Sequence, residues 1–169
     1  MDLTGDDVHM NKDIPVDEYD NYKEANSYYH FDGNQFVTIA KEVSLQGGIM
    51  FSYPGTSIGD IYSITSKYCF RDRMDAGKVM GLAPYGDPSV YRERLMHLED
   101  GRVEIDHSLL SQLVKPARSH AEFKANFQYY ADIANWVQRE VERTILDILN
   151  HRHQMSPSEN LAYAPGIAL

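Results

Sequence analysis

A long amphipathic segment constrains the fold of this chain more than any other feature. In YYADIANWVQREVERTILDILNHRH, residues 129–153, apolar side chains recur on one stripe over about five helical turns. The stripe comprises Ile133, Val137, Val141, Ile145, Ile148 and Leu149, and charged residues fall largely off it, namely Glu140, Glu142, Arg143 and Asp147. This pattern predicts one long helix whose apolar face must be covered by other parts of the chain.

The segments before this helix predict strands as well as helices. SYYHF (27–31) and QFVTIAK (35–41) favour strands, and the intervening Asp32, Gly33 and Asn34 indicate a hairpin. Apolar residues at spacings of three and four predict a helix over about 57–70. DPSVYRERLMHL (87–98) is expected to be a short helix that begins at an Asp-Pro pair, and EDGRVEI (99–105) a second hairpin.

Three further segments complete the expected organisation. Residues 1–26 and DAGKVMGLAPYG (75–86) are expected to be loops, with Met80, Leu82 and Tyr85 packing against the core. NLAYA (160–164) is expected to be a buried strand. The resulting order of elements indicates an α/β fold, and we expect residues 1–169 to be a single domain or part of one.

Composition excludes several classes of function. The chain has 25 acidic and 16 basic side chains and a net charge of -9, which argues against nucleic acid or an anionic membrane as a general partner. The single cysteine, Cys69, excludes a disulfide framework and a cysteine-based structural zinc site. No signal-peptide pattern or apolar run of about 20 residues is present, so we expect a cytoplasmic protein that does not cross a membrane.

The glycine-rich stretch GKVMGLAPYG fits no standard phosphate-binding pattern. A Walker A loop needs a lysine and Ser/Thr after its last glycine, whereas Lys78 follows the first glycine here. Taken alone, the three glycines favour a tightly packed turn over a ligand site. His151 and His153 cannot share a metal ion, because side chains two positions apart on a helix diverge by about 200°.

Four segments nevertheless resemble, in order, the O-carbamoyltransferases of nodulation-factor and antibiotic biosynthesis. GKVMGLAPYG resembles the signature of that family, MDLTGDD its turn at a strand end, and PGTSIGDIYSITSKYCF one of its helices. DIANWVQREVERTILDIL and NLAYAPGIAL resemble its long helix and the strand and glycine turn that follow. The resemblance implies an incomplete actin-like ATPase domain of the ribonuclease-H-like type, with a mixed sheet and flanking helices.

The resemblance also implies a reaction. The family is expected to transfer a carbamoyl group from carbamoyl phosphate to a hydroxyl of a small-molecule acceptor, through a carbamoyl-adenylate formed with ATP and Mg. It implies a divalent metal of the iron type, whose histidine motif and later aspartate are expected outside this chain, as is the carboxy-terminal domain. We therefore expect the 169-residue chain alone to be inactive, and the resemblance leaves its oligomeric state open.

Five residues match the nucleotide-binding positions of the family, and four of them have a structural alternative. Asp2 is expected beside the nucleotide, with a contribution to a metal or a water, or it caps a turn. Gly59 and Asp60 contact phosphate or ribose at a helix start, or they only cap that helix. Lys78 meets a phosphate or is solvated. Gly166 is expected to face the nucleotide, and the resemblance assigns no catalytic residue.

Two departures from the family pattern favour a different class of function. Pro165 stands where the family has the first glycine of a pair, and it lacks an N–H that could donate to phosphate. Leu3 stands where the opening turn usually has glycine. The alternative is therefore a non-catalytic interaction or scaffold module that keeps the fold without the site.

Overall fold

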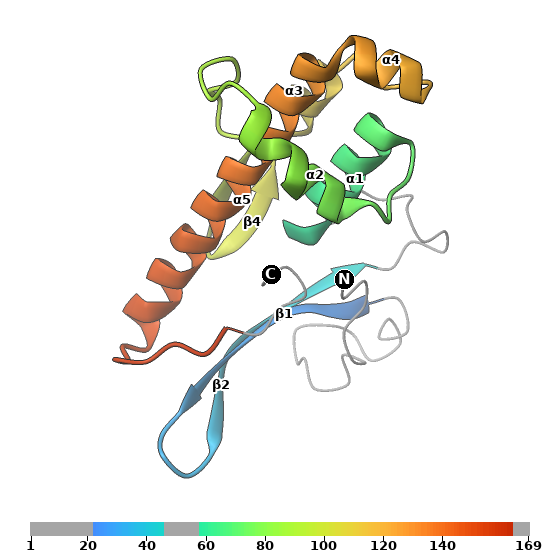
Figure 1. Cartoon of the computed structure of the whole chain (residues 1–169). Helices are drawn as coiled ribbons and strands as arrows, with labels where there is room; N and C mark the ends of the chain where they lie inside the picture. Colours follow the sequence, from blue (N-terminus) through green and yellow to red (C-terminus); the bar gives the residue numbers. More distant parts are fainter. Residues whose placement is uncertain (1–21, 46–57, 164–169) are drawn as a thin grey trace. The chain divides into compact units, whose positions relative to one another are not determined.

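The computed structural model describes residues 22–45 and 58–163 (Figure 1). They fall into two compact units, the first within Met1–Gly59 and Ile148–Leu169 and the second Asp60–Asp147. Helices and strands both occur, as the α/β prediction requires. The described strands form two separate two-stranded antiparallel sheets, whereas a larger mixed sheet was expected.

The first unit contains a hairpin of β1 (Tyr22–Phe31) and β2 (Phe36–Leu45). The Asp32 carboxylate accepts a hydrogen bond from the backbone N–H of Asn34 at 2.8 Å, and Gly33 has a φ of 96°. These are the residues that predicted the turn, and the hairpin is confirmed. The expected loop over 1–26 is wrong for residues 22–26, which belong to β1; residues 1–21 lie outside the described part.

Two helices confirm the strongest periodic patterns. α1 spans Ile58–Phe70 and α5 spans Phe127–Met155. The Tyr62 hydroxyl donates to Gln138 Oε1 at 2.7 Å, and the hydroxyls of Tyr68 and Tyr129 lie 2.7 Å apart. Because the earlier residue of α1 meets the later residue of α5, the two helices run antiparallel within the second unit.

The glycine-rich segment is helical, so the loop expected over 75–86 is wrong. α2 spans Ala76–Leu82 and is followed by the 3-10 helix η2, Ala83–Tyr85. Val79 and Leu82, three residues apart, bury their side chains on one face of this segment. The expected packing role of Tyr85 is also wrong, because its side chain is 65% exposed.

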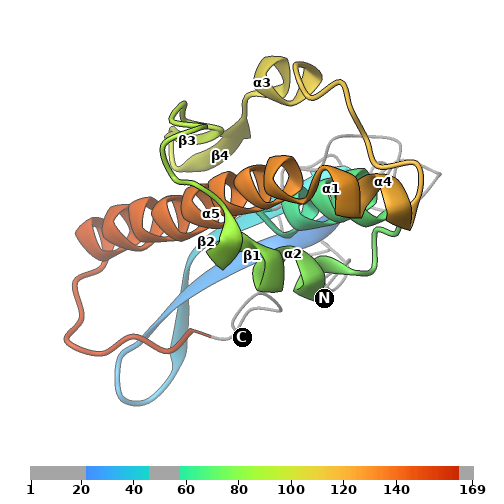
Figure 2. The same cartoon turned by 45° about the horizontal axis from the view of Figure 1, so that its top comes forward.

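The second hairpin is confirmed, and the helix expected over 87–98 is wrong. β3 (Met96–Glu99) pairs with β4 (Arg102–Ile105) through a turn in which Asp100 and Gly101 have φ values of 48° and 79°. Residues 87–95 form no helix, because side chains of α5 hydrogen-bond their backbone instead. Figure 2 shows this hairpin beside α5.

Two short helices were not expected, and one expected strand is wrong. α3 (His107–Ser111) begins at Asp106, and α4 (His120–Ala125) begins at Ser119; both side chains accept from backbone N–H groups of the first turn. The segment NLAYA is not a strand over 160–163, where the chain is irregular and exposed; residue 164 lies outside the described part.

The core of the second unit lies between α1, α2, β3–β4 and one side of α5. Its buried apolar side chains include Ile61, Tyr62, Cys69, Val79, Leu82, Leu95, Met96, Val103, Tyr130, Ile133, Val137 and Val141. The apolar stripe predicted for the long helix is thus buried through Val141. Glu140, which the pattern placed off this stripe, is nevertheless only 2% exposed.

Candidate functional site

The structure describes three of the five predicted nucleotide-binding residues. Asp2 and Gly166 lie outside the described residues, as do Leu3 and Pro165. Gly59 and Asp60 lie in the first turn of α1, which places their backbone at the helix start that the sequence predicted. Lys78 lies in α2 rather than in a loop.

Lys78 sits on the surface beside the end of α1. Its side chain is 61% exposed, and its ammonium group pairs with the Asp75 carboxylate at 2.6 Å. The same ammonium lies 6.0 Å from the centre of the Phe70 ring. A surface ion pair of this kind contributes on the order of 0–1 kcal/mol to stability. The pair with Asp75 therefore does not fix the Lys78 side chain in one position.

Asp60 lies in the first turn of α1, whereas Lys78, in α2, lies beside the other end of α1. Phe70, the neighbour of Lys78, is the last residue of that helix, ten positions after Asp60. At a rise of about 1.5 Å per residue, roughly 15 Å separate the two ends. The lysine and the helix start therefore do not contact the same phosphate group.

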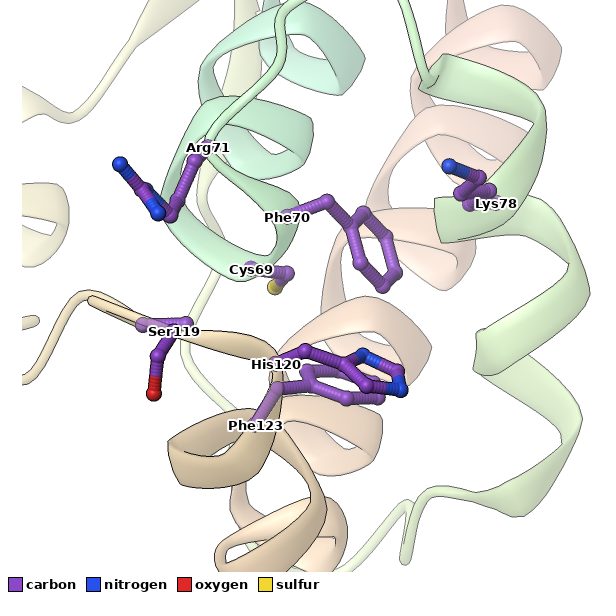
Figure 3. A pocket seen from close by; sticks show the side chains of 8 residues that line it. Cys69, Phe70, Arg71, Lys78, Ser119, His120 and Phe123 are labelled. Atoms are coloured by element: carbon purple, nitrogen blue, oxygen red, sulfur yellow. The ribbon is translucent and has the colours of Figure 1, made fainter.

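A pocket of about 250 Å³ surrounds the end of α1 (Figure 3). It lies between α1, α2 and α4, and its lining residues are Cys69, Phe70, Arg71, Lys78, Ala117, Ser119, His120 and Phe123. In Figure 3, Arg71 and Ser119 border one side, and Lys78 lies across the Phe70 ring from them. Burial raises the pKa of the Cys69 thiol to about 12, so this side chain is a neutral part of the wall.

A second feature, which the sequence analysis missed, is a row of polar side chains on α5. Gln128 Nε2 donates to the carbonyl of Tyr85 at 3.0 Å, and Asn135 Nδ2 donates to the carbonyl of Ala83 at 3.1 Å. Between them, the buried Asp132 carboxylate accepts from the backbone N–H of Asp87 at 2.7 Å. These contacts fix the backbone at the end of the glycine-rich segment onto α5.

The row continues along the next turn of α5. Trp136 Nε1 donates to the carbonyl of Glu93 at 2.8 Å, and an Arg139 guanidinium nitrogen donates to the carbonyl of Tyr91 at 2.6 Å. The Tyr91 ring stacks on Trp136 with centroids 5.1 Å apart. Polar groups spaced at three and four residues thus replace the hydrogen bonds that a helix over 87–98 would have made.

Glu140 ends the row as a buried carboxylate. One of its oxygens accepts from the backbone N–H groups of Leu95 and Met96, at 2.7 and 3.3 Å. The carboxylate also lies 2.9 Å from a guanidinium nitrogen of Arg143 and 3.5 Å from that of Arg94. The side chain therefore anchors the start of β3. The sequence did not indicate this anchoring role, because a charged residue beside an apolar helical stripe usually faces water.

Gly86 is the glycine that the packing requires. A Cβ atom at this position would overlap the carbonyl oxygen of Ala131 and lie 2.5 Å from Cβ of Asn135. A Cβ atom at Gly77 or Gly81 would meet nothing within 4 Å. The packed-turn interpretation therefore holds for Gly86 and fails for the two helical glycines.

The described residues limit the chemistry in two respects. No group of three or more His, Cys, Asp or Glu side chains within 22–45 and 58–163 is arranged to hold a metal ion. None of the helices in those ranges combines the length and the apolar character of a membrane span.

The sequence of residues 21–169 matches the family described as carbamoyltransferase N-terminus. This chain belongs to that family. Nodulation protein NolNO of Sinorhizobium fredii is 32% identical over 120 residues, which cover 66% of this chain and 17% of the relative. Nodulation protein NolO of Bradyrhizobium diazoefficiens is 32% identical over 128 residues, covering 70% and 23%. The family resemblance seen in the sequence is confirmed, and the matched part is about a fifth of each relative.

Proposed function

We propose that this chain is part of an ATP-dependent carbamoyltransferase. The whole protein would move a carbamoyl group from carbamoyl phosphate to a hydroxyl of a small molecule, through a carbamoyl-adenylate formed with ATP and Mg. The observation that carries the proposal is the family match over residues 21–169. The helices and antiparallel strands are compatible with part of an actin-like ATPase domain, which we propose as the fold of the complete domain.

The start of α1 is the nucleotide contact that we propose within the described residues. A helix N-terminus carries a partial positive charge that suits phosphate, and Gly59 in this first turn allows close approach of a ligand. Together, Gly59 and Asp60 would contact phosphate or ribose of the nucleotide. Asp2 and Gly166 are proposed for the same nucleotide on the resemblance alone, because both lie outside the described residues.

A metal has no proposed role among the described residues. The carbamoyltransferase resemblance implies a divalent ion of the iron type, but the structure offers no suitable group of ligands in 22–45 and 58–163.

Calorimetric titration with ATP-Mg tests the proposal. We expect a version extended at both ends to bind the nucleotide and to transfer carbamoyl groups, and the 169-residue chain to show no transfer. A scaffold module would ignore ATP in both forms, so the absence of binding to the extended version contradicts the proposal and supports the alternative.

A pair of matched variants tests whether the nucleotide binds at the start of α1. In the extended version, Gly59→Leu should weaken ATP binding by about tenfold or more, because the new side chain prevents at least one charge-assisted hydrogen bond. Gly77→Leu is the control, since Gly77 is an exposed helical glycine with open space around it. Equal losses in both variants would remove α1 from the proposed nucleotide site.

A further inference from the structure

We propose that the pocket at the end of α1 binds the phosphate group of a small molecule. The pocket lies between the last turn of α1, α2 and the start of α4, and Figure 3 shows its lining side chains. It lies about 15 Å from the start of α1 by helical rise, so it is separate from the proposed nucleotide contact. The inference does not rest on the proposed reaction.

The polar groups that line this pocket can all donate hydrogen bonds. Arg71 and Lys78 supply charged N–H groups, His120 a ring nitrogen and Ser119 a hydroxyl. None of the eight lining residues is acidic, and the carboxylate paired with Lys78 belongs to Asp75, which is outside this lining. A surface made of donors and cations suits a ligand that consists of acceptors, and a phosphate group has about three acceptor oxygens.

Aromatic stacking holds one of these donors in place. The His120 ring stacks on Phe123 at an interplanar angle of 11°, and Phe123 stacks on the buried Tyr130 at 21°. The Phe70 ring lies 5.1 Å from Phe123 and forms the neighbouring wall. These rings form an apolar wall beside the exposed donors of the pocket.

Arg71 occupies a backbone position that would suit glycine better. It follows α1 with a φ of 70°, and its N–H donates to the carbonyl of Lys67 at 3.0 Å, which is the usual geometry of a helix C-terminus. A side chain at positive φ is strained, whereas glycine is not. The guanidinium has no ion-pair partner in the described part of the chain. Binding a ligand gives a reason for arginine at this position.

Both cations could instead serve only to complement the partial negative charge at the end of α1. The contacts disfavour this role, because Lys78 donates to Asp75 rather than to a carbonyl of α1. The carbonyl of Lys67 is also taken by the backbone of Arg71. At about 250 Å³, the pocket is smaller than a typical site for a drug-sized ligand, so it suits a phosphate or diphosphate group rather than a whole nucleotide.

Titration of the full 169-residue chain with inorganic phosphate and with pyrophosphate tests the proposal. We expect saturable binding, tighter for pyrophosphate, and about tenfold weaker in Arg71→Gly and in Lys78→Gln, since each variant removes a charge-assisted hydrogen bond. Glycine accepts the backbone conformation at position 71, so Arg71→Gly should keep the fold. A loss of phosphate binding in this variant would therefore be due to the missing guanidinium group. A parallel titration with ATP distinguishes free phosphates from those of a nucleotide.

Two control variants separate a site from general electrostatics. Arg102→Gln removes an exposed positive charge on β4, and Asp100→Gly relaxes the other described non-glycine residue with positive φ. Both should bind pyrophosphate within about twofold of the parent chain, a difference that corresponds to less than ~0.5 kcal/mol. The proposal is overturned if neither phosphate nor pyrophosphate saturates, or if Arg102→Gln weakens binding as much as Arg71→Gly.

Discussion

Replacement of Glu140 by alanine should destabilise the second unit severely. The substitution leaves the backbone N–H groups of Leu95 and Met96 buried without their acceptor. Each such loss costs about 1–3 kcal/mol. The ion pairs add little, because the side chains of Arg94 and Arg143 are 42% and 40% exposed. We therefore expect a total of about 3–5 kcal/mol, a large part of the ~5–15 kcal/mol that stabilises a typical domain.

Urea denaturation followed by circular dichroism measures this change. Glu140→Gln keeps an acceptor oxygen but loses the charge, so we expect it to cost about half as much as Glu140→Ala. Glu142→Ala is the matched control, because Glu142 is exposed and contacts only Gln138 in the described hydrogen bonds. It should change the free energy of unfolding by no more than about 0.5 kcal/mol. If Glu140→Ala and Glu142→Ala have equal effects, Glu140 does not anchor β3.

The glycines and the cysteine give further predictions. Gly81→Ala should stabilise α2 by about 0.5–1 kcal/mol, because glycine is a poor helix former and the added methyl meets open space. Gly86→Ala should destabilise by about 1–3 kcal/mol through overlap with the Ala131 carbonyl; thermal unfolding of both variants checks the opposite signs. The buried Cys69 has its pKa raised from 9.0 to about 12, so iodoacetamide should not label it at about pH 8 without denaturant. The folded state holds this proton more tightly, so its stabilising effect is complete below pH 9 and is lost as the pH rises towards 12, which urea titrations across that range would detect. Rapid labelling of the native chain would contradict the burial.

The sequence predicted those elements whose signals are local. The turn residues Asp32 and Gly33 predicted the first hairpin, and Asp100 and Gly101 the second, because these residues adopt the required backbone angles whatever surrounds them. The stripes of α1 and α5 were equally clear, since a helix brings apolar residues at spacings of three and four onto one face and a strand does not.

The sequence failed where tertiary contacts decide the conformation. An Asp-Pro pair is a good helix start. The backbone of residues 87–95 is instead held by hydrogen bonds to side chains of α5, which lie more than 40 positions further along the chain. No local pattern carries that information. The pocket was missed for the same reason: Arg71, Lys78 and His120 come from three separate elements, and only Lys78 stood in a recognised motif.

The glycine-rich signature divides into two parts with different physical causes. Its end is explained by packing, because Gly86 lies against α5 and the backbone on either side is hydrogen-bonded to Gln128 and Asp132. Packing does not explain its beginning. Gly77 and Gly81 each destabilise a helix by about 0.5–1 kcal/mol relative to alanine, and no contact in the described residues offsets this cost. Packing therefore explains Gly86 at the end of the signature, whereas Gly77 and Gly81 at its beginning have no structural explanation in the described residues.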